Sequence, residues 1–263
     1  MAWGFAAGEL VGAAHLATAL EPLARAFAVW EVTGEAAFAT PEGLARVREV
    51  LPSFALRLTF HAAFRKVDLA APDPATRERD VRLVAGQVAA ARSLGAEAIV
   101  VHPGKRIRGL ADPRAEERCR ASLAALAGAG REHGVQVRVE NMPAGDEELA
   151  RSGAALASLA EVAGAACWDL GHARTWPAGS VPGAALRFVR EAHLHHNRGR
   201  GDDHFPLEAD DPWWVPALDA LERPGLVVVL EHRRAEECLV SLRVAQAALA
   251  SPRAGAGRSA PGA

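Results

Sequence analysis

The sequence predicts a single (β/α)8 TIM barrel. Short apolar runs alternate along the chain with segments whose apolar residues have helical spacing. Several runs are continuously apolar, such as Ile99-Val100-Val101 and Val227-Val228-Val229-Leu230, as strands of a helix-covered parallel sheet require. Strands and helices that alternate in this way over 263 residues favour a closed barrel over an open doubly wound sheet.

Eight strands are expected, and the clearest helices lie between the later ones. Several helices stop at a glycine, as at Leu94-Gly95 and His133-Gly134, which is a common helix end. The barrel is expected to occupy residues 1–250, and 251–263, rich in Ser, Pro, Ala, Gly and Arg, is expected to be a disordered tail. The strand predictions are Trp3–Ala6, Ala26–Val32, Ala55–Phe60, Ala98–Val101, Val135–Val139, Ala166–Trp168, Ala192–His195 and Leu226–Leu230, and the helix predictions are Thr76–Leu94, Arg114–His133, Glu147–Ala163 and Glu236–Ala250.

Composition excludes several classes of protein. A formal net charge of -2 gives no general attraction to nucleic acid or acidic membranes. The three cysteines are too scattered for a disulfide framework and suit a reducing cytoplasm. Glu9 interrupts the N-terminal apolar stretch, so no signal peptide is expected, and no apolar run reaches the roughly 18 residues of a membrane span. We therefore expect a cytoplasmic protein, and no protein partner is evident.

Almost every predicted strand ends in a side chain that can bind a metal ion. In a barrel, the C-terminal ends of the strands converge on one face, which holds the active site. Buried carboxylates and imidazoles need partners, and a divalent cation satisfies many of them together. Mixed His and Asp/Glu ligands favour zinc, with manganese or iron as alternatives. The candidate metal ligands are His61, His102, Glu140, Asp169, His172, His193, Asp202, His204 and Glu231.

Together these short motifs resemble the xylose isomerase-like barrels, which include endonuclease IV and the sugar-phosphate isomerases and epimerases. The resemblance extends from the second strand to the eighth. It rests on the order and spacing of His61-Ala62-Ala63-Phe64, His102-Pro103-Gly104, Glu140-Asn141, Asp169-Leu170-Gly171-His172, His193-Leu194, Asp202-Asp203-His204-Phe205-Pro206-Leu207 and Leu230-Glu231. The chain departs from the DNA-repair members at its N-terminus, after Leu207, and at His196, where those members have an aspartate.

The resemblance implies two uses of the site. Isomerases and epimerases hold one metal ion, here with Glu140, Asp169, His193 and Glu231. Endonuclease IV holds three metal ions, and its additional ligands correspond to His61, His102, His172, Asp202 and His204. In the first use, Glu140 and Glu231 would be the catalytic acid and base around the metal. In the second, they would bridge metal ions that activate water and hold the phosphoryl oxygens.

Because all nine positions carry the matching residue type, we expect phosphodiester hydrolysis by a site with two or three metal ions. The alternatives are a sugar isomerase or epimerase with one metal ion, and a catalytically inactive barrel that binds a ligand. Basic residues follow the strand ends and predict a phosphorylated substrate. The net charge of -2 favours a small substrate over DNA. The residues expected to bind it are Lys105, Arg106, Arg174, Arg198 and Arg200.

Two further residues are ambiguous. Glu31 ends the second strand, where it would contact substrate or lie at the surface. The alternation of a strand places His195 on the same side as His193, so His195 is a candidate to support the metal ligands.

Overall fold

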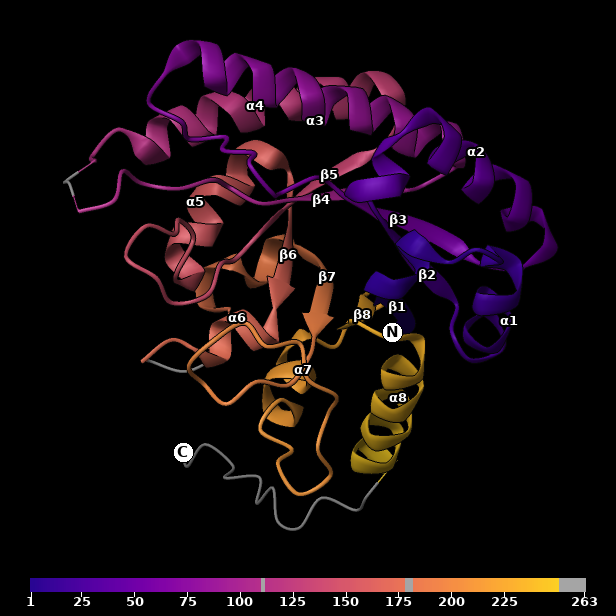
Figure 1. Cartoon of the computed structure of the whole chain (residues 1–263). Coiled ribbons are helices and arrows are strands. Elements are labelled where there is room, and N and C mark those ends of the chain that lie inside the picture. Colours follow the sequence, from indigo (N-terminus) through magenta and orange to yellow (C-terminus); the bar gives the residue numbers. More distant parts are fainter. Residues whose placement is uncertain (110–111, 178–181, 251–263) are drawn as a thin grey trace, which may run out of the picture.

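Eight parallel strands close into a barrel in which each strand pairs with its neighbours in chain order, and β1 pairs with β8 (Figure 1). The computed structural model describes residues 1–109, 112–177 and 182–250. The predicted barrel is confirmed, and the predicted tail, 251–263, lies outside the described residues. The strands are β1 (Ala2–Ala7), β2 (Val29–Thr33), β3 (Arg57–His61), β4 (Ala98–Val101), β5 (Gln136–Glu140), β6 (Ala165–Asp169), β7 (Val189–Leu194) and β8 (Val227–His232).

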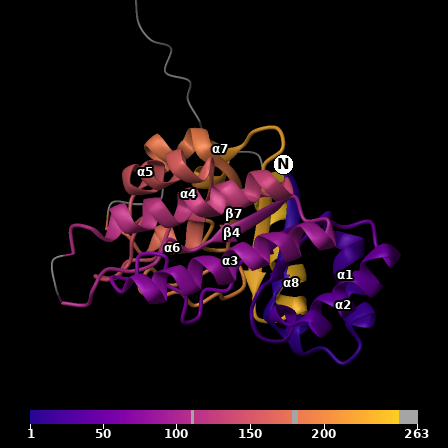
Figure 2. The same ribbon diagram turned by 90° about the horizontal axis from the view of Figure 1, so that it is seen from above.

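Helices surround the barrel, with α3 and α4 packed side by side (Figures 1 and 2). Among the described residues, no helix combines the length and the apolar character that crossing a membrane requires. The α-helices are α1 (Leu16–Ala26), α2 (Pro41–Val50), α3 (Pro74–Leu94), α4 (Ala115–His133), α5 (Gly153–Ala163), α6 (Leu170–Arg174), α7 (Val215–Leu221) and α8 (Ala235–Ala250). Short 3-10 helices are η1 (Gly8–Gly12), η2 (Ala36–Ala39), η3 (Leu51–Ser53) and η4 (Gly183–Phe188).

Local signals explain where the helices begin and end. Asp73 caps α3 by accepting a hydrogen bond from the Thr76 amide at 2.8 Å, and Gly95 ends the same helix with a left-handed φ of 81°, a conformation that glycine adopts without strain. The expected helix from Glu147 starts later, because Ser152 caps α5 instead. Glu147 and Glu148 instead form ion pairs with Arg108 and Lys105, which lie in the loop between β4 and α4.

The interior of the barrel is built in layers, because residues two apart on a strand point to the same side. At the bottom, Val29, Val227 and Val229 form a small apolar cluster. Above the apolar layer, Glu191 accepts hydrogen bonds from Thr59 Oγ1 at 3.0 Å and Arg138 Nη1 at 2.7 Å.

Two residues further along the same strands lie the predicted ligands. His61 follows Thr59 on β3, and Glu140 follows Arg138 on β5. His193 follows Glu191 on β7 in the same way. The alternation of the strands therefore places the ligands in the uppermost layer, at the C-terminal mouth of the barrel.

Candidate metal centre

The structure brings all nine predicted ligands to the C-terminal mouth of the barrel. Six belong to the ends of strands β3 to β8 or directly follow them, and one lies on α6. Two lie in the loop between β7 and α7, which brings Asp202 close to His172 and His195. In that order they are His61, His102, Glu140, Asp169, His193 and Glu231, then His172, then Asp202 and His204.

Glu140 joins two groups of ligands. Its Oε2 lies 3.3 Å from His61 Nε2 and 3.1 Å from His102 Nε2. Its Oε1 lies 3.0 Å from His193 Nδ1. Because the two oxygens of one carboxylate face different imidazoles, Glu140 is placed to bridge two cations or to bind one cation while contacting a neighbouring group.

The central group consists of Glu140, Asp169, His193 and Glu231, whose ligand atoms all lie within 4.8 Å of one another. His193 Nδ1 is 3.4 Å from Glu231 Oε2 and 4.0 Å from Asp169 Oδ2. Three carboxylates and one imidazole at this separation form a complete set of donors for one divalent cation.

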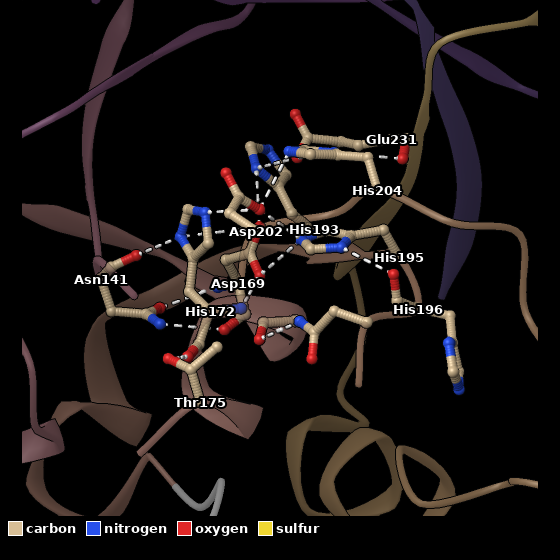
Figure 3. A network of polar contacts seen from close by, with 12 residues as sticks. Asn141, Asp169, His172, Thr175, His193, His195, His196, Asp202, His204 and Glu231 are labelled. Atoms are coloured by element: carbon tan, nitrogen blue, oxygen red, sulfur yellow. Dashed lines mark hydrogen bonds and ion pairs between the residues drawn. The ribbon is translucent and has the colours of Figure 1, made fainter. Parts of the chain in front are cut away.

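The third group is organised around Asp202. Its Oδ1 lies 3.1 Å from His204 Nε2 and 3.4 Å from the Nε2 atoms of both His172 and His195 (Figure 3). The ring of His195 stacks on that of His204, with centroids 4.0 Å apart. His195 therefore belongs to the cluster, as the alternation of β7 had indicated, whereas the neighbouring His196 turns away to Asp211, 3.1 Å distant.

Hydrogen bonds fix the positions of several candidate ligands. The amide side chain of Asn141 donates to the carbonyl of Asp169 at 2.9 Å and accepts from its N–H at 2.8 Å. His172 Nδ1 donates to the carbonyl of Asn141 at 2.7 Å, which leaves Nε2 facing Asp202. Fixing one ring nitrogen in this way selects the tautomer whose other nitrogen is free to bind a metal.

The charges of the cluster depend strongly on one another. Burial lowers the pKa of His61, but its hydrogen bond to Glu140 and the surrounding carboxylates raise that pKa to about 9. Burial raises the pKa of Glu140, yet the charge of His193 and the hydrogen bonds from His102 and His61 hold it well below its usual range. The surrounding carboxylates thus favour the protonated form of His61, and the surrounding imidazoles favour the ionised form of Glu140.

A divalent cation fits this donor set. Asp169 Oδ2 and His195 Nε2 are buried without a hydrogen-bond partner among the described residues, and an unsatisfied buried polar atom costs about 1–3 kcal/mol. A cation would satisfy such atoms and would replace the imidazole protons as the source of positive charge. The mixture of imidazoles and carboxylates suits zinc, manganese or iron.

Seven of the nine candidate ligands, all except Asp169 and His193, line a cavity of about 480 Å3. Its apolar wall includes Trp30, Phe38 and Phe64. Two basic residues also line it, Arg65 after β3 and Arg233 after β8, and neither forms an ion pair within the described part of the chain. The cavity is thus partly apolar, with two available guanidinium groups.

The five basic residues expected to bind substrate lie elsewhere. None of them is among the residues that line this cavity. Lys105 pairs with Glu148 at 2.8 Å, and Arg174 pairs with Asp211 at 2.6 Å. The remaining three are Arg106, which lines a different cavity, Arg198, which lies over the Phe205 ring, and Arg200. The structure does not gather the five into one binding site.

Glu31 is, with His195, one of the two residues at the site whose role the sequence left undecided. It is 1% exposed and lines the cavity, so it is not at the surface. The available signal was its position, because Glu31 comes directly after the buried apolar residues Val29 and Trp30 on β2, although the strand continues to Thr33 and does not end at Glu31 as expected.

Comparisons with known proteins agree with the fold. A model of the xylose isomerase-like TIM barrel family matches residues 13–254, whereas no curated protein matches the chain. Among solved structures, a D-tagatose 3-epimerase-like protein has a TM-score of 0.80 at 20% identity, covering 95% of this chain and 97% of that one. Five further similar structures are sugar epimerases.

Two similar structures come from Thermus thermophilus. The TTHB071 protein, soaked with ZnCl2, has a TM-score of 0.72 at 25% identity, covering 96% of this chain and all (100%) of that one. Endonuclease IV has a TM-score of 0.65 at 24% identity, covering 95% and 99%. Similarity at such low identity establishes the fold, and the chemistry has to be argued from the site.

Proposed function

The chain belongs to the xylose isomerase-like TIM barrel family, and we propose that it is a metal-dependent isomerase or epimerase of a small sugar-like substrate. The observation that carries this proposal is the central group. The carboxylates of Glu140 and Glu231 come from different sides of the barrel, β5 and β8, lie within 4.8 Å of each other in that group, and line one cavity. A substrate carbon bound there meets a carboxylate from each strand.

This arrangement suits proton transfer at a carbon next to a carbonyl group. Epimerisation removes the proton from one face of that carbon and returns a proton to the opposite face. In this proposal, one of Glu140 and Glu231 accepts the first proton as general base and the other donates the second as general acid. Bound by Glu140, Asp169, His193 and Glu231, a divalent cation would supply Lewis-acid polarisation of the neighbouring carbonyl.

The cavity supports a small substrate. About 480 Å3 falls within the usual range for small-molecule pockets, and apolar walls with a few polar groups are typical of them. The imidazoles of His61 and His102, which line the cavity, would donate hydrogen bonds to substrate hydroxyl groups. Several of the similar structures are sugar epimerases, which favours this function over the phosphodiester hydrolysis that the sequence put first.

We further propose that the substrate carries an anionic group such as a phosphate. The residues suited to it are Arg65 and Arg233 rather than the five predicted basic residues, because both line the cavity and have no ion-pair partner within the described residues. Arginine binds phosphate through paired hydrogen bonds. The cytoplasm remains the proposed compartment, in keeping with three free, buried cysteines.

Hydrogen exchange tests the reaction. The protein, loaded with Zn2+ or Mn2+, is incubated in D2O with a panel of ketoses and ketose phosphates, and 1H NMR follows deuterium entry next to the carbonyl. Glu140→Gln and Glu231→Gln should slow exchange by about 100-fold or more, while Glu208→Gln, whose side chain is 54% exposed, should not. Loaded protein that promotes no exchange with any member of the panel would refute the proposal.

Phosphodiester hydrolysis is the second candidate, and one observation favours it. Beyond the central group, His61 and His102 flank Glu140 Oε2, and His172 and His204 flank Asp202, so the donors suffice for two further cations. Elemental analysis of the purified protein decides between the two. Two or three metal ions per chain with cleavage of bis(p-nitrophenyl) phosphate supports hydrolysis, whereas one ion without cleavage supports the isomerase. No bound metal would favour the inactive ligand-binding barrel.

A further inference from the structure

Glu31 is a buried carboxylate that the proposed reaction does not use. It lies on β2 and is 1% exposed. Neither of its side-chain oxygens has a hydrogen-bond partner among the described residues. A charged group buried in this way is costly unless it has a task or a counter-charge.

Glu31 forms an ion pair with His193, one of the candidate metal ligands. Glu31 Oε2 lies 3.3 Å from His193 Nε2, and the two atoms are close without being aligned for a hydrogen bond. The other nitrogen of the same ring, Nδ1, faces Glu140 Oε1 at 3.0 Å and Glu231 Oε2 at 3.4 Å. His193 therefore lies between the central group and Glu31.

A neighbouring carboxylate, Glu191, does not compete for this role. It accepts hydrogen bonds from Thr59 and Arg138 through its two different oxygens. Glu31, Glu191 and His193 are close enough to form a metal site of their own, but the ion pair with Arg138 at 2.7 Å already neutralises Glu191. The pairing of Glu31 with His193 is the better explanation.

We propose that Glu31 is a positioning residue for the metal ligand His193. The Glu31 carboxylate accepts a hydrogen bond from the Nε2–H group of His193. The imidazole is thereby held in the tautomer whose Nδ1 lone pair would point at the cation. Imidazole ligands commonly donate their second N–H to a carboxylate, which fixes the ring and increases its basicity. Such contacts are often poorly aligned in the unliganded protein and tighten in the functional complex. This inference rests on the metal site of the proposed function and is independent of the reaction.

Metal affinity tests this role without any substrate. Metal-free full-length protein competes for Zn2+ with a chromophoric chelator, and its dissociation constant is compared among Glu31→Gln, Glu31→Leu and the matched control Glu97→Gln. Glu97 lies outside the barrel mouth, in an exposed ion pair with Arg57. We expect weakening of about tenfold for Glu31→Gln, about 100-fold for Glu31→Leu, and none for Glu97→Gln.

Two further measurements separate positioning from a general structural role. In 15N NMR of metal-free, histidine-labelled protein, at a pH high enough for the His193 ring to be neutral, the proton should lie on Nε2 in the wild type and lose that preference in Glu31→Leu. Metal-free Glu31→Gln, which keeps an oxygen that can accept a hydrogen bond from Nε2 of His193, should keep the circular dichroism spectrum of the wild type, so that its weaker Zn2+ binding reports the site and not the fold. Zn2+ affinity within twofold of the wild type in both Glu31 variants, or an unchanged His193 tautomer, would overturn the inference. An absence of isomerase activity would leave these results intact.

Discussion

Substituting Gly171 by alanine should disrupt the third group, around Asp202, although the substitution replaces none of the candidate ligands. A Cβ atom at Gly171 would overlap the imidazole of His195, lying 2.7 Å from its Nδ1 and nearer still to two other ring atoms. That ring cannot easily move away. It is fully buried, its Nε2 lies 3.4 Å from carboxylate oxygens of both Asp169 and Asp202, and it stacks on His204.

The expected magnitude follows from this overlap. Inserting a methyl group into a packed site costs about 1–3 kcal/mol, which lowers the melting temperature of a domain of this size by about 2–12 °C. The assay is thermal unfolding in the presence of chelator, followed by a Zn2+ titration, in which Gly171→Ala should bind metal more weakly. Gly86→Ala is the control, since a Cβ there meets nothing within 4 Å. At that helical position alanine stabilises by up to about 1 kcal/mol.

A double substitution tests the cause. If the His195 ring is the obstacle, Gly171→Ala should cost little in a His195→Ala background, so that the two changes are strongly non-additive. Strict additivity, or a Gly171→Ala protein with wild-type melting temperature and metal affinity, would refute the reasoning.

Three more predictions follow from the site and its surroundings. Arg65→Ala and Arg233→Ala should each raise the KM for a ketose phosphate about tenfold, because hydrogen bonds to charged groups contribute about 1.5–3 kcal/mol. Arg106→Ala, which changes a residue of a different cavity, should leave that KM unchanged. If all three variants changed the KM equally in steady-state kinetics, Arg65 and Arg233 would not be the residues that bind the phosphate. Burial raises the pKa values of the thiols of Cys119, Cys167 and Cys238, so a thiol reagent should label none of them in the native protein and all three after denaturation. Zn2+ at 100 times its dissociation constant should stabilise the fold by about 2.7 kcal/mol, a rise of about 5–10 °C by calorimetry; no rise would exclude binding selective for the native state.

The barrel and its ligand layer were predictable because both depend on local pattern. A strand such as Val227–His232 is a run of apolar residues that ends in polar ones, and the closure of the barrel then brings distant strand ends together. His61 and Glu231, which are far apart in the sequence, needed no more information than their positions at the ends of β3 and β8.

Pairings between distant residues were not predictable in this way. Nothing local to Arg138 indicates its ion pair with Glu191, 53 residues away, inside the barrel. Two of the five basic residues expected to bind substrate do not line the cavity for a similar reason. Lys105 and Arg174 follow strand ends as expected, but acidic residues from other loops, Glu148 and Asp211, already pair with them.

The wall of the cavity and its ligands have different origins in the chain. Much of the wall comes from β1, β2 and the short helices after them, including Val11 on η1 and Phe38 on η2, whereas the nine ligands come from β3 onward. Much of the wall and all nine candidate ligands are therefore encoded by separate stretches of the gene. Recombination or a designed library confined to η1 and η2 would vary the wall of the cavity and leave every candidate ligand unchanged, which makes this barrel a convenient starting scaffold for laboratory evolution.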